Sequence, residues 1–167
     1  GAYARGGGGS DAEVRSWVMA RLLWDPAADA DALVSEWMKG VYGAAAEPMR
    51  AWFDLLHGRF RGAAGAARHL FVYDPPTAEW LSDELLVAGT RLFDQAEALG
   101  AGDATAAEYV AKARLALRFA LLAREPREGE ELDAFLVDVR RRGITELREG
   151  QAVAAWEAEY RKAARAR

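Results

Sequence analysis

The chain has 167 residues, of which 51% are hydrophobic and 29% charged, with a formal net charge of -4 and no cysteine. This composition predicts a folded chain rather than a disordered one, and its length suits one domain with its own core. The acidic balance argues against a nucleic-acid-binding domain, which needs a basic surface. The lack of cysteine excludes disulfides and thiolate metal sites. No apolar run is long enough to cross a bilayer, so no membrane segment is predicted.

The first ten residues are rich in glycine and differ in composition from the rest of the chain. We interpret residues 1–10 as a flexible Gly-rich lead-in and residues 11–167 as a helical domain. A phosphate-binding loop is a poor alternative because the glycines lack the following lysine and the preceding strand. The chain starts at Gly1, so a native start, a domain boundary and an engineered linker all stay open at this point.

The first predicted helix runs to about Trp24. Ser10 and Glu13 have the spacing of a capping box, which marks a helix start. Asp25-Pro26 ends the helix, since proline disfavours helical backbone at the preceding residue. Apolar side chains occur around most of the circumference, which predicts a deeply buried helix. These are Val14, Trp17, Val18, Leu22 and Leu23.

Two further helices are predicted over residues 29–41 and 44–60. Asp29 or Asp31 is the expected N-cap of the first of them, because a short acidic side chain can accept from free backbone N–H groups. The apolar positions recur at three- and four-residue spacing, which predicts one buried stripe on each helix. On this pattern three tryptophans from the first three helices are expected in the core: Trp17, Trp37 and Trp52.

The rest of the chain is also predicted to be mainly helical. Residues 69–73 form a short extended connector or a lone strand. Ser82 caps the next helix, and Thr105 with Glu108 forms a second capping box. Later helices cover residues 129–142 and the region after Val153, with the connector 144–150 between them. The predicted fold is therefore all-α, a compact array of about seven helices with at most one short extended segment.

The two histidines do not form a metal or nucleophile motif. His57 lies near the end of a predicted helix, where a histidine interacts well with the helix dipole. His69 is twelve residues further on, so the pair lacks the helical spacing of zinc ligands. We therefore predict no catalytic, cofactor-binding or metal-ligating residue and no cofactor.

The acidic clusters have ordinary structural interpretations. Asp25, Asp29 and Asp31 lack the central glycine and distal glutamate of a calcium loop. A second cluster lies where a helix begins, which predicts a solvated turn favoured by the dipole rather than an acid–base pair. Its members are Glu125, Glu128, Glu130 and Glu131.

Six tryptophans are the most informative part of the composition. Sugar-stacking platforms are one interpretation, but most lie on apolar helix faces, which favours core packing. Trp80 lies with Phe71 and Tyr73 in a connector, where exposed aromatics can bind ligands, but packing is favoured over recognition there too. The run 140–142 is all arginine, and cations suit a helix end; a nucleic-acid contact is the weaker alternative.

Residues 17–56 contain a Leu-Leu-Trp-Asp-Pro element at 22–26 and a Tyr-Gly element at 42–43. In these elements the chain resembles a bacterial family with a domain of unknown function (DUF4838), which is related to glycoside hydrolases. Residues 80–96 also look like that family's next helix. The resemblance implies a preceding barrel, similar to that of alpha-glucuronidases, which carries the catalytic carboxylates. No residue of this chain matches those carboxylates.

The resemblance implies a non-catalytic C-terminal helical domain that supports a carbohydrate-active barrel. The expected partners are that barrel or another protein, a carbohydrate through the parent protein, and a second copy of the chain. The alternatives are an independent helical module that binds proteins through a groove between helices, and a self-contained enzyme. The sequence preceding Gly1 in the gene would distinguish the barrel-supporting domain from the independent interaction module.

Overall fold

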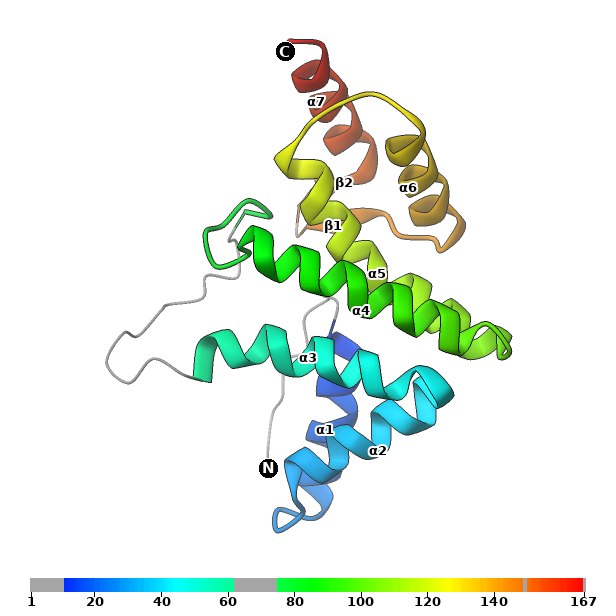
Figure 1. Ribbon diagram of the computed structural model, residues 1–167. Helices are drawn as coiled ribbons and strands as arrows, with labels where there is room; N and C mark the ends of the chain where they lie inside the picture. Colours follow the sequence, from blue (N-terminus) through cyan, green and yellow to red (C-terminus); the bar gives the residue numbers. More distant parts are fainter. Residues whose placement is uncertain (1–10, 62–74, 149, 167) are drawn as a thin grey trace. The chain divides into compact units, whose positions relative to one another are not determined.

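The computed structural model of the protein describes residues 11–61, 75–148 and 150–166 (Figure 1). These residues form seven α-helices, one short 3-10 helix and a two-stranded hairpin, so the predicted all-α class is confirmed. They group into two units. Unit 1 holds residues 11–61 and 87–114, and unit 2 holds residues 75–86, 115–148 and 150–166. None of the described helices is both long and apolar enough to span a membrane.

Unit 1 begins with a helical layer in which α2 packs against both α1 and α3. The layer agrees with the predicted helices to within about two residues, the usual uncertainty of helix ends. Asp29 is the N-cap of α2, since its Oδ1 accepts from the backbone N–H of Asp31 at 2.8 Å and of Ala32 at 3.3 Å. The elements are α1 (Ala12–Trp24), α2 (Ala30–Tyr42), the 3-10 helix η1 (Gly43–Ala45) and α3 (Ala46–Arg61).

The next two helices are α4 (Asp83–Gly100) and α5 (Ala104–Arg124). Residues 87–100 of α4 and 104–114 of α5 belong to unit 1. Ser82 caps α4 as predicted, accepting from the N–H of Leu85 at 3.4 Å. The predicted capping box of α5 is wrong. Asp103 caps this helix instead, because its Oδ1 accepts from the N–H of Thr105 at 2.8 Å and of Ala106 at 3.1 Å. A carboxylate two residues earlier outcompetes the threonine hydroxyl.

The prediction of a deeply buried first helix is wrong. Val14 is the buried residue of α1, while Trp24 is 92% exposed. Trp17, Trp37 and Trp52 are also not fully buried, so their expected place in the core is corrected to a half-buried one. An apolar pattern around a helix does not say how many neighbours the helix has. The buried core of unit 1 consists instead of residues such as Met38, Tyr42, Met49, Phe93, Ala96 and Val110.

Trp52 of α3 packs directly on the backbone of α4. Its ring centroid lies 5.8 Å from that of Phe93, and a Cβ added to Gly89 would lie 2.7 Å from its Cζ3 atom. A real Cβ does not approach another carbon so closely. The glycine therefore permits the contact between α3 and α4.

We expect Gly89→Ala to lower the free energy of unfolding by about 1–2 kcal/mol, because the methyl group pushes the Trp52 ring away and overpacking outweighs the gain in helix propensity. Gly40→Ala in α2 is the matched control, since nothing lies within 4 Å of the added Cβ. That control should gain up to about 1 kcal/mol. Urea unfolding of both variants measures the difference; equal stabilities would show that the contact does not need a glycine.

Unit 2 contains α6, α7 and the short antiparallel hairpin between them. The hairpin was not predicted, since residues 144–150 were expected to be a plain connector, and its strands are too short to give a period-two pattern. The predicted extended segment 69–73 lies outside the described residues. The elements are α6 (Glu130–Arg141), β1 (Glu146–Arg148), β2 (Gln151–Ala152) and α7 (Val153–Arg165).

Aromatic rings form the centre of the unit 2 core. Phe135 of α6 is completely buried, with ring centroids 5.7 Å from Trp156 of α7 and 6.4 Å from Phe119 of α5. The Trp156 ring in turn lies 4.9 Å from Tyr160. Aromatic pairs at these distances add to the stabilisation from area burial alone. The core of unit 2 therefore joins three helices through four rings.

Candidate functional site

One face of α1 presents large apolar side chains to solvent. Met19 is 40% exposed and Leu23 is 57% exposed, and their four-residue spacing places them on the same side of the helix. At 3.6 residues per turn, Leu23 points away from the buried Val14. Trp24 extends this surface at the end of the helix. We call Met19, Leu23 and Trp24 the α1 strip.

Trp17, in the same helix, differs from the residues of the α1 strip because the side chain of Arg21 lies over its ring. The guanidinium of Arg21 lies 5.1 Å from the centroid of the Trp17 ring, and its Nη1 is 3.5 Å from Glu36 Oε1 of α2. Trp24 is instead almost fully exposed. A tryptophan carries roughly 150–250 Å² of surface, and a contiguous exposed apolar patch typically marks a contact surface.

A polar cluster lies at the other end of α1. Asp11, the N-cap residue, has its Oδ2 3.8 Å from Nε2 of His57 in α3. Burial raises the pKa of the Asp11 carboxyl, although the nearby charges of His57 and Arg15 oppose this effect. Burial also raises the pKa of the Tyr42 hydroxyl, and the negative charge of Asp11 adds to that rise. We call Asp11, Tyr42 and His57 the polar cluster.

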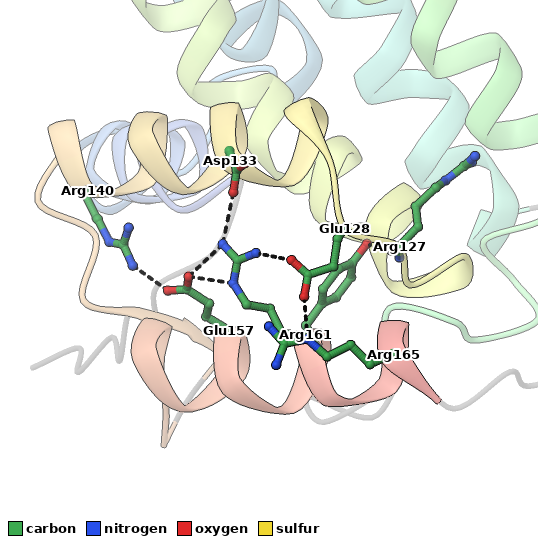
Figure 2. Close-up of polar contacts among 8 residues, drawn as sticks. Arg127, Glu128, Asp133, Arg140, Glu157, Arg161 and Arg165 are labelled. Atoms are coloured by element: carbon green, nitrogen blue, oxygen red, sulfur yellow. Dashed lines mark hydrogen bonds and ion pairs between the residues drawn. The ribbon is translucent and has the colours of Figure 1, made fainter. Parts of the chain in front are cut away.

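In unit 2, Arg161 of α7 is surrounded by carboxylates (Figure 2). Its Nη1 lies 2.6 Å from Glu128 Oε2, and its Nη2 lies 3.0 Å from both Asp133 Oδ1 and Glu157 Oε1. Arg165 Nε adds a second contact to Glu128 at 2.9 Å. Hydrogen bonds from Arg161 and then Arg165 hold the pKa of Glu128 below its usual value. These contacts join the start of α6 to α7.

Asp138 of α6 forms ion pairs with two arginines. Its Oδ2 accepts from Arg118 of α5 at 2.7 Å, and its Oδ1 accepts from Arg142 at 2.8 Å. Burial alone would raise the pKa of Asp138, but the hydrogen bonds from Arg142 and Arg118 outweigh it and leave the pKa lowered. Arg118 also lies over the Phe135 ring at 5.6 Å, so this ion-pair group borders the aromatic core.

Most of the acids that the sequence analysis singled out have structural partners, and they do not converge on one site. The predicted solvated glutamate turn is confirmed, since these side chains are exposed at the start of α6, and Glu128 and Glu131 also bind arginines of α7 and α5. Asp31 pairs with Arg50, and Asp25 accepts from the N–H of Ala27 at 3.1 Å. Within the described residues, no group of three or more His, Asp or Glu side chains is placed to hold a metal ion.

Other singled-out residues have separate positions. Trp80 is half-buried, while Phe71, Tyr73 and His69 lie outside the described residues. In the arginine run, Arg140 pairs with Glu157 and Arg142 with Asp138, so these side chains stabilise the end of α6. His57 lies near the end of α3, as predicted, and its Nδ1 is 2.7 Å from the Phe53 carbonyl oxygen. Its contact with Asp11 was missed, since no local pattern links positions 46 residues apart.

One family model matches the part of the chain that contains α1, α2 and the first half of α3. Residues 2–54 match the family described as "Domain of unknown function (DUF4838)". No curated protein and no solved structure matches the chain. The match includes the elements at 22–26 and 42–43 on which the resemblance to this family rests. It ends before residues 80–96, so a family likeness there stays a prediction.

Proposed function

We propose that the chain is a non-catalytic helical domain of a glycoside-hydrolase-like protein, where it supports a carbohydrate-active barrel. The observation that carries the proposal is the position of the α1 strip within residues 2–54, the stretch that matches the DUF4838 family. In this proposal the preceding barrel packs on Met19, Leu23 and Trp24. The strip has the apolar character of such an interface.

The contacts of the acids support a structural rather than a catalytic role for this domain. Glycosidases use two carboxyl groups on either side of the scissile bond, about 5–10 Å apart. Here Asp54 and Asp31 share Arg50, while Glu128 and Glu157 share Arg161. Arginines that bind these carboxylates hold them in place within the fold, which suits a role in stability better than a role at a reaction centre.

A dye-binding experiment tests this proposal. The chain alone is expected to bind a hydrophobic dye through the α1 strip, and the same chain joined to the protein encoded immediately upstream is expected to bind much less. Leu23→Ser with Trp24→Ser should reduce dye binding of the lone chain by at least about half, because it removes the two most exposed side chains of the α1 strip.

Val137→Ser is the matched control, since Val137 is 63% exposed but lies in unit 2. It should leave the contact with the upstream protein unchanged. An upstream sequence without a barrel, or a barrel that does not contact the chain, would contradict the proposal. The independent helical interaction module would then be the better interpretation.

A further inference from the structure

The tautomer of His57 is set by its surroundings. Nδ1 lies 2.7 Å from the carbonyl oxygen of Phe53, and a carbonyl oxygen can only accept. The hydrogen of a neutral imidazole is therefore on Nδ1. The ring also stacks on Phe53, with centroids 3.9 Å apart and planes at 30°, which fixes its direction. Nε2 then faces Asp11.

The interaction between Nε2 and Asp11 depends on one proton. In neutral His57 the lone pair of Nε2 faces the carboxylate at 3.8 Å, with no hydrogen between them. In protonated His57, a positive N–H group faces the same carboxylate. The side chains are only 34% and 27% exposed, so water screens the attraction less than it does between fully exposed charges.

The charged and titratable groups around this pair come from three helices, α1, α2 and α5. Arg15 in α1 lies near Asp11, and Glu13 in α1 is paired with Lys112 of α5 at 2.5 Å. Tyr42 of α2 interacts electrostatically with Asp11 and with Tyr109 of α5. Of these groups, a histidine is the one that ordinarily changes charge between about pH 5 and 8.

We propose that Asp11 and His57 form a proton-dependent tether between the start of α1 and the second half of α3. Asp11 makes no side-chain capping hydrogen bond to α1, so its carboxylate is available to His57 among the described residues. Protonated His57 holds the first turn of α1 on α3. When His57 loses its proton, the half-buried carboxylate loses its partner and this turn opens more often.

The sign of the pH dependence is determined by both groups. The tether needs a protonated His57 and an ionised Asp11, so it is strongest in mildly acidic solution. Loss of the His57 proton removes the attraction. Burial raises the pKa of Asp11, and below that pKa the carboxyl is protonated and the attraction is lost again.

Amide hydrogen exchange tests the tether. Between about pH 5.5 and 8, protection factors of the amides of residues 15–18 in the wild-type chain should fall about two- to fivefold. His57→Gln and Asp11→Asn should each show nearly constant protection, because each removes one member of the pair. His69→Gln, at the other histidine of the chain, is the matched control and should keep the wild-type pH dependence.

Each variant gives an independent test, so poor folding of one leaves the other decisive. Protection that is flat in the wild type, or that still falls with pH in Asp11→Asn, would overturn the tether. A pH dependence that disappears in His69→Gln but persists in His57→Gln would overturn it as well, by assigning the effect to the other histidine. Far-UV circular dichroism at both pH values checks that the overall helix content is unchanged.

Discussion

Phe135→Ala is expected to lower the free energy of unfolding by about 3–5 kcal/mol, the usual range for a large aromatic side chain removed from a core. Phe135 has no exposed surface, and its ring contacts Phe119 and Trp156 from two other helices. Truncation removes the apolar burial and leaves a cavity among rigid rings. Guanidinium unfolding followed by circular dichroism measures the loss, with hydrogen exchange of α6 amides as a probe specific to unit 2.

Val137→Ala in the same helix is the control for this substitution. Val137 is exposed, so the change should stay within about 0.5 kcal/mol of the wild type. Phe135→Leu should lie between the two, because it keeps part of the apolar volume. A midpoint for Phe135→Ala close to that of Val137→Ala would mean that the aromatic core of unit 2 is not formed as described.

Asp138→Asn is expected to lower the free energy of unfolding by about 1.5–3 kcal/mol, the range for hydrogen bonds that involve charged groups. The substitution keeps the shape of the side chain but leaves the charges of Arg118 and Arg142 less well compensated. The Arg142 side chain is only 7% exposed, so water does little to replace the lost carboxylate. Urea unfolding at neutral pH and low salt measures the effect.

The stability difference between wild type and Asp138→Asn has a defined pH dependence. The pKa of Asp138 is lowered in the fold, so its stabilising contribution is present above the ordinary pKa of an aspartate and is lost as the pH falls through the folded value. The difference between the two proteins should therefore shrink in acid, below about pH 4.

Asp133→Asn is the matched control on the same helix. Asp133 pairs with Arg161, but its side chain is 64% exposed, and exposed ion pairs contribute about 1 kcal/mol or less. An equal loss of stability in both variants, or a difference for Asp138→Asn that does not change with pH, would contradict the assigned role of Asp138.

Local sequence signals predicted the helices well because their causes lie within one or two turns. Asp29 and Ser82 cap α2 and α4 as their positions suggested. The error at Thr105 has the same local origin, since Asp103 accepts from the N–H groups of Thr105 and Ala106 and starts the helix two residues earlier. Where two caps compete within three residues, spacing alone does not decide between them.

The candidate sites were less predictable because they depend on distant partners. Arg161 binds Glu128 and Asp133, which lie 33 and 28 residues earlier in the chain. Trp24 shows the same difficulty for apolar residues. Its helical pattern fits a core position, and only the packing of α1 against α2 shows that this side chain lies outside.

The exposure of Trp24 makes the α1 strip visible to fluorescence without a label. The other five tryptophans are half-buried or buried, so Trp24 is the indole most open to water and to a quencher such as iodide. A partner that covers the strip would exclude the quencher and move the emission of this one indole toward shorter wavelengths. Comparison with Trp24→Phe isolates its signal, so occupation of this surface can be followed in the unmodified chain.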